Sequence, residues 1–155
     1  MRSSQPQPKQ PGTYILVLEN RRRRRIRVGR VGEWDFARGW YLYVGSAFGP
    51  GGVAARCGHH RRISPRPRWH IDYLRAECRL AQIWFSHDPL RREHQWAGLL
   101  AEQLGLQQPV PGFGASDCRC GSHLFISAVK PCYRSFENAA DSYLNDHETI
   151  YCEIV

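Results

Sequence analysis

Apolar and polar residues follow the spacing of β-strands in several parts of the chain. Residues 13–18 (TYILVL) are apolar or β-branched throughout, which predicts a buried strand. In residues 26–31, Ile26 and Val28 alternate with polar positions, which predicts a strand with one face in solvent. We expect these two segments to form a hairpin. Further strands are predicted at residues 40–44, 81–87 and 123–129.

Helical segments are predicted between these strands. Residues 53–62 (VAARCGHHRR) form a short basic helix, and residues 69–78 become helical near Asp72. Asp88 and Pro89 begin the longest predicted helix, which ends at Gly105. Its apolar stripe consists of Trp96, Leu99, Leu100 and Leu104. The resulting order of elements predicts an α+β fold, a small, mostly antiparallel β-sheet flanked by helices.

The last part of the chain is weakly patterned and strongly acidic. Residues 129–155 contain 2 basic and 5 acidic residues, whereas residues 12–128 contain 18 arginines and 9 acidic residues. Two alternatives remain for the end of the chain: a short helix around residues 135–144, or a mobile acidic tail. We divide the chain into a lead-in at residues 1–11, a main domain at 12–129 and an acidic C-terminal extension at 130–155.

The net charge of +8 favours an anionic polymer as partner, DNA or RNA. A run of five arginines at residues 21–25 is either a solvated segment or a finger that contacts phosphates. Two more arginines stand at the end of the basic helix. The candidate nucleic-acid-binding residues are therefore Arg21, Arg22, Arg23, Arg24, Arg25, Arg61 and Arg62.

The sequence also indicates a compartment. The lead-in is polar and rich in proline, so we expect it to be disordered rather than a signal peptide. No apolar run approaches the roughly 18–20 residues that a membrane helix needs. With no secretory signal, the six cysteines are expected to be reduced thiols in a cytoplasmic protein.

Two tyrosines stand on strands that we expect to be neighbours. Tyr14 follows Gly12 closely, and Tyr43 lies next to Gly45; glycine in a strand lets a ligand or another backbone approach. Tyrosines in strands are often packing residues. Beside a basic helix, however, their hydroxyls could orient or deprotonate a water molecule.

The basic helix and the segment after it supply further candidates. Arg56 and His60 are four residues apart and share one helical face. The planar guanidinium of arginine suits a phosphoryl oxygen, and histidine can transfer a proton or hold a phosphate. The alternative is a solvated basic face. His70, next to Trp69, is either a further site residue or a hydrogen-bonded structural histidine.

Two possible metal sites are present. Glu93 borders the apolar stripe of the longest helix, where a carboxylate facing a basic cleft could hold Mg²⁺ with water and phosphate as the other ligands. It could instead be a glutamate that favours a helix start. Cys118, Cys120 and His123 offer three soft ligands without an evident fourth, so we expect a loop packed by thiols rather than a zinc site.

Taken in order, these positions resemble the GIY-YIG endonuclease superfamily. GTY at residues 12–14 stands where that family has Gly-Ile-Tyr, and YVG at residues 43–45 stands where it has Tyr-Ile-Gly. Arg56 and His60 match the arginine and histidine of the helix that follows. Glu93 looks like the metal-binding glutamate of the family's later helix.

Longer strings resemble the small Uri-type branch of the superfamily. They are GWYLYVGSAFGPGG at 39–52, RWHIDYL at 68–74, which contains His70, and FGASDCRCGSHLF at 113–125. The chain departs from the pattern in four ways. The interval from Tyr14 to Tyr43 is longer than in compact members, because the arginine-rich hairpin intervenes, and Thr13 replaces the usual isoleucine. Arg68 stands where the branch commonly has histidine, and the asparagine that many members place after the glutamate has no clear match.

The resemblance implies a metal-dependent endonuclease that hydrolyses phosphodiester bonds in DNA, in repair or defence. In that mechanism Glu93 holds one Mg²⁺ or Mn²⁺ ion, and Tyr14 acts on the attacking water as general base, directly or through a relay. Tyr43 positions water or phosphate, Arg56 offsets charge on the phosphoryl oxygens, and His60 supports Tyr14 or shuttles the proton.

Two other functions remain open. One is a nucleic-acid-binding module that uses the same basic surface without catalysis. The other is a zinc-stabilised interaction domain built on Cys118, Cys120 and His123.

Overall fold

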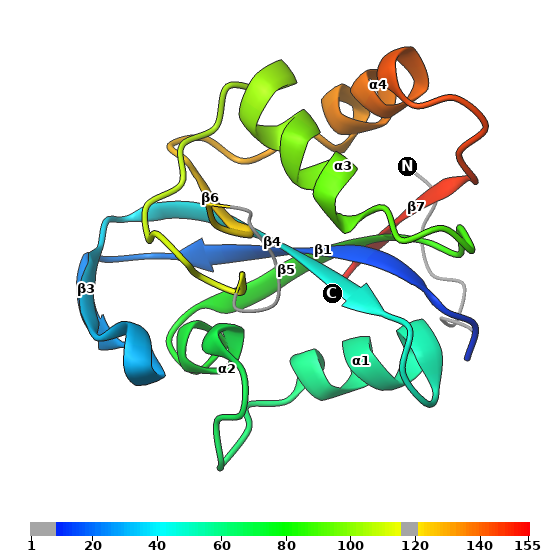
Figure 1. Ribbon diagram of the computed structural model, residues 1–155. Helices are drawn as coiled ribbons and strands as arrows, with labels where there is room; N and C mark the ends of the chain where they lie inside the picture. The colour runs from blue at the N-terminus through cyan, green and yellow to red at the C-terminus, as the bar shows by residue number, and fades with distance from the viewer. Residues whose placement is uncertain (1–8, 116–120) are drawn as a thin grey trace.

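A five-stranded antiparallel sheet forms the centre of the computed structural model, which describes residues 9–115 and 121–155 (Figure 1). Its strand order is β6-β4-β1-β5-β7. The strands are β1 (Gly12–Asn20), β4 (Gly39–Ala47), β5 (Arg79–Ser86), β6 (Leu124–Ser127) and β7 (Ile150–Ile154). The predicted α+β fold is confirmed.

Helices cover both faces of this sheet (Figure 1). One face carries α1 (Gly52–Arg61) and α2 (His70–Arg75). The other carries α3 (Glu93–Gly98), a turn of π-helix η2 (Leu99–Gln103), and α4 (Tyr133–Tyr143). No helix among the described residues is long and apolar enough to cross a membrane.

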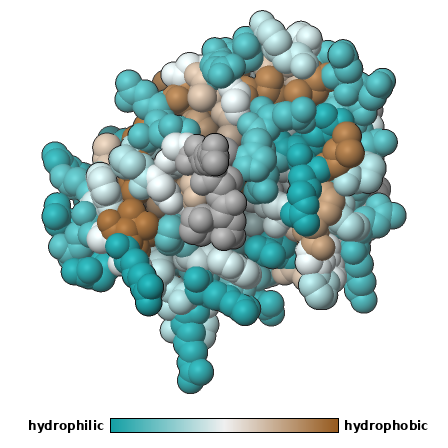
Figure 2. All heavy atoms as spheres, viewed as in Figure 1, coloured by the Kyte–Doolittle hydropathy of each residue, from teal (hydrophilic) through white to brown (hydrophobic). Residues whose placement is uncertain are grey.

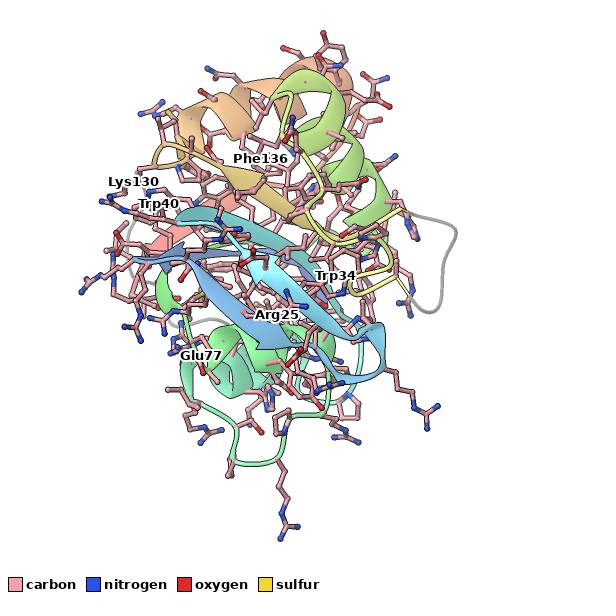
Figure 3. The ribbon with its side chains drawn as sticks, turned by 90° about the vertical axis from the view of Figure 1, so that its left-hand side faces the viewer. Arg25, Trp34, Trp40, Glu77, Lys130 and Phe136 are labelled. Carbon is pink, nitrogen blue, oxygen red and sulfur yellow. The ribbon has the colours of Figure 1, made fainter. Side chains whose placement is uncertain are left out.

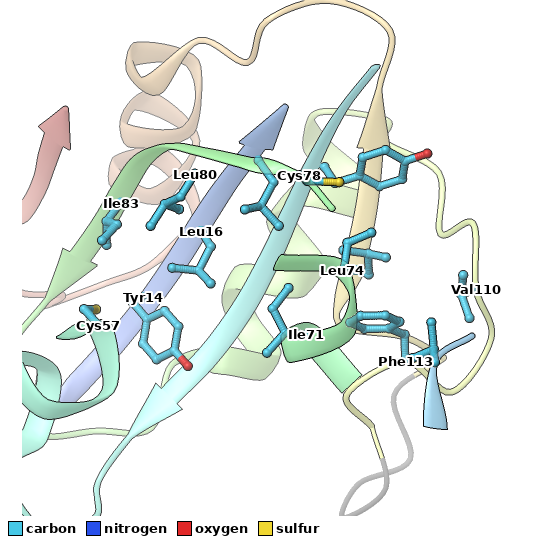
Figure 4. Close-up of a cluster of buried hydrophobic side chains, with 14 of the residues drawn as sticks. Tyr14, Leu16, Cys57, Ile71, Leu74, Cys78, Leu80, Ile83, Val110 and Phe113 are labelled. Atoms are coloured by element: carbon cyan, nitrogen blue, oxygen red, sulfur yellow. The ribbon is translucent and has the colours of Figure 1, made fainter. Parts of the chain in front are cut away.

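Strand β1 is buried on both faces because its side chains alternate between two cores. Leu16 packs with Leu80, Ile83 and Cys57 on the side of α1 and α2, as Figure 4 shows. Ile15 belongs to the second core, under α3 and α4. This explains the continuous apolar run at residues 13–18. Outside these cores, hydrophilic side chains cover most of the face seen in Figure 2.

The expected hairpin of residues 13–18 and 26–31 is wrong. Strand β2 (Arg24–Arg27) pairs with β3 (Glu33–Phe36) in a separate two-stranded sheet. Both edges of β1 are already taken by β4 and β5, so β1 has no free edge for β2. The turn between β2 and β3 contains the short 3₁₀ helix η1 (Gly29–Val31) and Gly32, whose φ of 95° favours glycine. Figure 3 shows this hairpin with Arg25 and Trp34 labelled.

The longest predicted helix begins later than expected, at Glu93 rather than at Asp88. The Asp88 carboxylate accepts hydrogen bonds from the backbone N–H groups of Leu90 and Glu148 and from the Arg92 guanidinium. These contacts hold residues 88–92 in a non-helical segment before α3, with Asp88 and Arg92 buried and the three residues between them exposed. The predicted end is confirmed, because Gly105 has a φ of 65°. Trp96, Leu99 and Leu100 are buried, as the stripe predicted.

The mobile acidic tail is also wrong, and the alternative helix is confirmed as α4. Phe136 of α4 stacks on Trp84 of β5, with ring centroids 5.4 Å apart. The Tyr133 hydroxyl donates a hydrogen bond of 2.7 Å to the carbonyl of Ile150, at the start of β7. Strand β7, which the sequence did not predict, pairs with β5. The last residues of the chain therefore complete the central sheet.

Candidate functional site

A cavity of about 620 Å³ opens where one end of the central sheet meets α1, α2 and α3. Five residues predicted for the nuclease site line it, although each comes from a different element and together they span 80 positions of sequence. They are Tyr14, Tyr43, Arg56, His70 and Glu93. The fold thus brings together side chains that the sequence keeps far apart.

Tyr14 of β1 and Gly45 of β4 occupy facing positions in the sheet. Their contact explains why the YVG motif at residues 43–45 ends in glycine. A Cβ atom on Gly45 would lie 2.3 Å from Cζ of Tyr14, much closer than carbon atoms approach without a shift. Only glycine at position 45 lets the Tyr14 ring lie across β4. This places its hydroxyl in the cavity wall.

The Tyr14 hydroxyl lies 2.8 Å from Nε2 of His60. His60 is 1% exposed, so it supports Tyr14 from behind the cavity wall. Burial lowers the pKa of His60 to about 3, because a charged imidazolium would lose its hydration there. Burial likewise raises the pKa of Tyr14 well above its usual value. At neutral pH the pair is therefore a neutral phenol beside a neutral imidazole.

Arg56 brings a positive charge to both tyrosines. Its guanidinium carbon lies 4.4 Å from the centre of the Trp69 ring, a cation–π contact that fixes the side chain at the cavity. Burial raises the pKa of Tyr43 to about 12, and the Arg56 charge acts in the opposite direction. Arg56 also opposes the upward shift of the Tyr14 pKa. An anion that enters the cavity would meet this guanidinium.

Glu93, the first residue of α3, places a carboxylate in the cavity wall. Its side chain is 20% exposed, and its Oε1 lies 3.9 Å from Nε2 of His94. Thr13 fixes the start of this helix, because its Oγ1 accepts a 3.2 Å hydrogen bond from the N–H of Arg92. The threonine that departs from the family motif thus ties β1 to the residue before Glu93. A cavity of this size with one carboxylate fits Mg²⁺ or Mn²⁺, which commonly keep several water ligands.

His70 lines the cavity and also has a structural contact. Its Nδ1 accepts a 2.8 Å hydrogen bond from the N–H of Gly114, so the neutral ring carries its hydrogen on Nε2. Burial lowers its pKa. His70 thus joins α2 to the loop before β6, which confirms the hydrogen-bonded structural histidine, and its role as a site residue stays a prediction.

The arginine run lies far from the cavity. Tyr14 and Asn20 are six residues apart on β1, roughly 20 Å at the rise of a strand, and the run begins beyond Asn20. Four of its five arginines form ion pairs with carboxylates. The pairs are Arg21–Glu19, Arg23–Asp35, Arg24–Glu77 and Arg25–Glu33. Much of the charge of the run is therefore balanced within the chain.

Other arginines at the cavity were missed as binding residues. Arg68 and Arg91 line it, and the Arg91 guanidinium lies 4.6 Å from the centre of the Phe48 ring. Phe48 and Arg91 are 43 positions apart in the sequence, and no short motif connects them. Of the other predicted residues, Arg61 pairs with Glu153 of β7, and Arg62 is exposed just after α1.

The predicted thiol cluster is described only in part. Cys118 and Cys120 lie outside the described residues. His123 is buried beside the cavity, with its ring centroid 5.8 Å from that of His94. Its backbone joins β4 to the preceding loop, since its carbonyl accepts from Val44 N–H and its N–H donates to the carbonyl of Phe113.

A family model matches most of the chain. The model of a family described as Domain of unknown function DUF123 matches residues 13–144, which include every residue of the cavity wall named above. No curated protein and no solved structure matches the chain significantly.

Proposed function

Because the chain belongs to the DUF123 family of GIY-YIG-like domains, we propose that it is a divalent-metal-dependent endonuclease that cleaves DNA. Within that superfamily we assign it to the small Uri-type branch. The observation that carries the proposal is the convergence of Tyr14, Tyr43, Arg56 and Glu93 on one cavity. Phosphodiester hydrolysis needs a cation near the phosphate, a carboxylate for a metal and a group that orients water.

In this proposal Glu93 holds one Mg²⁺ or Mn²⁺ ion, which would stabilise the negative charge that develops on the phosphate and on the leaving oxygen. The chain supplies the rest of the site. Arg56 binds a phosphoryl oxygen through its planar guanidinium, and its contact with Trp69 pre-orders it for this role. Arg68 and Arg91 attract the neighbouring phosphates.

Tyr14 orients the attacking water, and His60 holds the Tyr14 hydroxyl in the cavity wall. To accept a proton, Tyr14 must become a phenolate. Burial opposes that charge, whereas the Arg56 guanidinium favours it. Tyr43, on the adjacent strand, positions the water or the phosphate. Its pKa is likewise raised by burial and lowered by the Arg56 charge.

DNA contact is centred on the cavity in this proposal. Arg56, Arg68 and Arg91 line it, and the exposed Arg62 and Arg66 follow α1 in the same loop as Arg68. The run at 21–25 remains a second candidate surface. Its ion pairs with the chain's own carboxylates would have to open before these arginines could bind phosphates.

One observation favours the alternative, a module that binds nucleic acid without cleaving it. The two tyrosines have raised pKa values, so neither is a ready base at neutral pH. Such a module would bind DNA with a steep dependence on salt and would leave it intact.

The proposal is tested with labelled single-stranded, duplex and branched DNA, incubated with the full chain and Mg²⁺ or Mn²⁺. We expect internal cleavage with metal and none with excess chelator. A matched RNA substrate tests the choice of DNA. Salt-sensitive binding without cleavage under any of these conditions would support the alternative module instead.

A further inference from the structure

His60 has a buried ring nitrogen with no hydrogen-bond partner in the part of the chain that the structure describes. Its Nε2 is used by the Tyr14 hydroxyl, whereas its Nδ1 has no hydrogen-bond partner among the described residues. The side chain is 1% exposed, so bulk water does not satisfy this nitrogen. Buried polar atoms in folded proteins nearly always have a partner, and such an atom indicates a bound water or ion.

Two metal-binding side chains lie next to this histidine. His59, His60 and Asp72 each offer one donor atom, and the three atoms lie within 4.8 Å of one another. The His59 Nε2 and Asp72 Oδ1 are 2.8 Å apart. Metal–ligand bonds of about 2.0–2.2 Å place ligand atoms roughly 3–4 Å from each other. Small rotations of these side chains would therefore bring all three to one ion.

We propose that His59, His60 and Asp72 form a zinc site, separate from Glu93 and on the inner side of Tyr14. Two imidazoles and one carboxylate leave a fourth position for water, a donor set known for Zn²⁺. The site does not depend on whether the cavity cleaves DNA. It is also distinct from the predicted cluster of Cys118, Cys120 and His123.

Hydrogen bonds from neighbouring residues hold the Asp72 ligand in place, as is usual in metal sites. The second oxygen of Asp72 accepts hydrogen bonds from the backbone N–H groups of Arg68 (2.8 Å) and Trp69 (3.0 Å), which fixes the carboxylate and leaves Oδ1 directed at His59. An ion can enter from the protein surface. The His59 side chain is 31% exposed and borders a second cavity of about 340 Å³.

The donor atoms select the type of ion, in surroundings that are positively charged. Arg75 donates to the backbone carbonyls of His60 and Arg61, and Arg56 and Arg68 stand over Trp69. These charges oppose Mg²⁺ and Zn²⁺ alike, because both ions carry the same charge, but Mg²⁺ in addition prefers oxygen ligands and keeps its water. Zn²⁺ and Co²⁺ gain affinity from imidazole nitrogen. The site should therefore discriminate against the ion proposed for Glu93.

A bound ion would set the orientation of the hydrogen bond to Tyr14. A metal on Nδ1 leaves the ring hydrogen on Nε2, so His60 donates to the Tyr14 oxygen. The Tyr14 hydroxyl hydrogen is then available to a group in the cavity. The ion would also tie α1 to α2, since His59 and His60 belong to the first helix and Asp72 to the second.

The test is a Co²⁺ titration of the full chain after removal of metal by chelation, followed by visible absorption. We expect one equivalent bound, with the spectrum of a four-coordinate site that lacks a thiolate-to-cobalt band. Zn²⁺ should displace Co²⁺, and millimolar Mg²⁺ should not. His59→Asn, at a partly exposed position, should weaken Co²⁺ binding at least about tenfold, with its fold checked by circular dichroism.

Two controls separate this site from the others. Glu93→Gln, and the double variant Cys118→Ser with Cys120→Ser, should both keep the spectrum of the four-coordinate Co²⁺ site. Absence of stoichiometric binding overturns the proposal. So does binding that survives His59→Asn, or binding that is lost in the cysteine variant together with a thiolate band.

Discussion

Tyr14 and His60 are joined by a contact of 2.8 Å between the phenol oxygen and Nε2, and they are 46 positions apart in the sequence. The tyrosine lines the cavity, whereas the histidine lies behind it. Tyr14 and His60 therefore differ in their access to the cavity. Tyr14 can touch a substrate, and His60 acts on a substrate only through Tyr14.

Tyr14→Phe tests this arrangement. It removes the hydroxyl from the cavity and leaves Nε2 of the buried His60 without its partner. We expect about 1–3 kcal/mol lower stability from the unpaired nitrogen, and a loss of cleavage of roughly 10²–10⁴-fold if Tyr14 takes part in proton transfer. Tyr143→Phe is the matched control, because Tyr143 is 61% exposed and should change neither quantity. Full cleavage by folded Tyr14→Phe would remove Tyr14 from the mechanism.

Gly45→Ala tests the packing that places the Tyr14 ring. The added methyl group would lie 2.3 Å from Tyr14 Cζ, so either the ring or β4 must move. We expect a loss of about 1–3 kcal/mol in the free energy of unfolding, typical of overpacking. In Gly98→Ala the new methyl group meets nothing within 4 Å inside α3, so that variant should be neutral or more stable. Urea denaturation of both variants compares the two, and equal stabilities would contradict the predicted clash.

The sequence predicts those parts of the fold that depend on residues close together in the chain, and it misses those that depend on contacts between distant segments. The apolar run of β1 and the stripe with Trp96 and Leu100 were found because burial leaves a local period. The pairing of β2 with β3 was missed because strand partners are set by which sheet edges are already occupied. Strand β7 was missed because its five residues form a strand only against β5.

The cavity residues also could be predicted only as far as local sequence patterns mark them. Tyr14, Arg56 and Glu93 were found because their motifs mark them individually, although only the fold places them at one cavity. Nothing local marks Arg91 beside Phe48, because that contact exists only in the folded chain. The cluster of His59 with Asp72 was missed for the same reason.

Arg56→Ala and Arg23→Ala compare the two candidate DNA surfaces. Arg56 faces the cavity, whereas Arg23 pairs with Asp35 at the far end of β1. We expect Arg56→Ala to weaken DNA binding and to lower the slope of log affinity against log salt by about 1. Arg23→Ala should have a smaller effect, because Asp35 balances much of its charge. Fluorescence anisotropy at several salt concentrations measures both, and the reverse order of effects would move the interface to the hairpin.

Asp88 gives a prediction for acid stability. Backbone N–H groups of Leu90 and Glu148 and the Arg92 guanidinium hold the pKa of this carboxyl below its usual value, against the opposing effect of burial. Since the folded-state pKa is lower than the unfolded one, the contribution is present above about pH 4 and is lost as the pH falls through the folded-state pKa.

Asp88→Asn should therefore unfold more easily at pH 7 and show a shallower loss of stability between about pH 4 and pH 2. Urea unfolding at a series of pH values measures this slope. The exposed Asp141→Asn is the control. An Asp88→Asn variant as sensitive to acid as the original chain would show that other groups cause the acid dependence.

The central claim is that Glu93 and the residues around it form a site for DNA cleavage. It is tested most directly by cleavage rates of Glu93→Gln and Glu102→Gln, with DNA affinity measured alongside. Glu102 is an exposed glutamate of the η2 turn that follows α3. We predict that Glu93→Gln binds DNA but loses Mg²⁺-dependent cleavage, whereas Glu102→Gln cleaves normally. Metal-dependent cleavage that continues at the original rate in Glu93→Gln would contradict the assignment of this cavity as the active site.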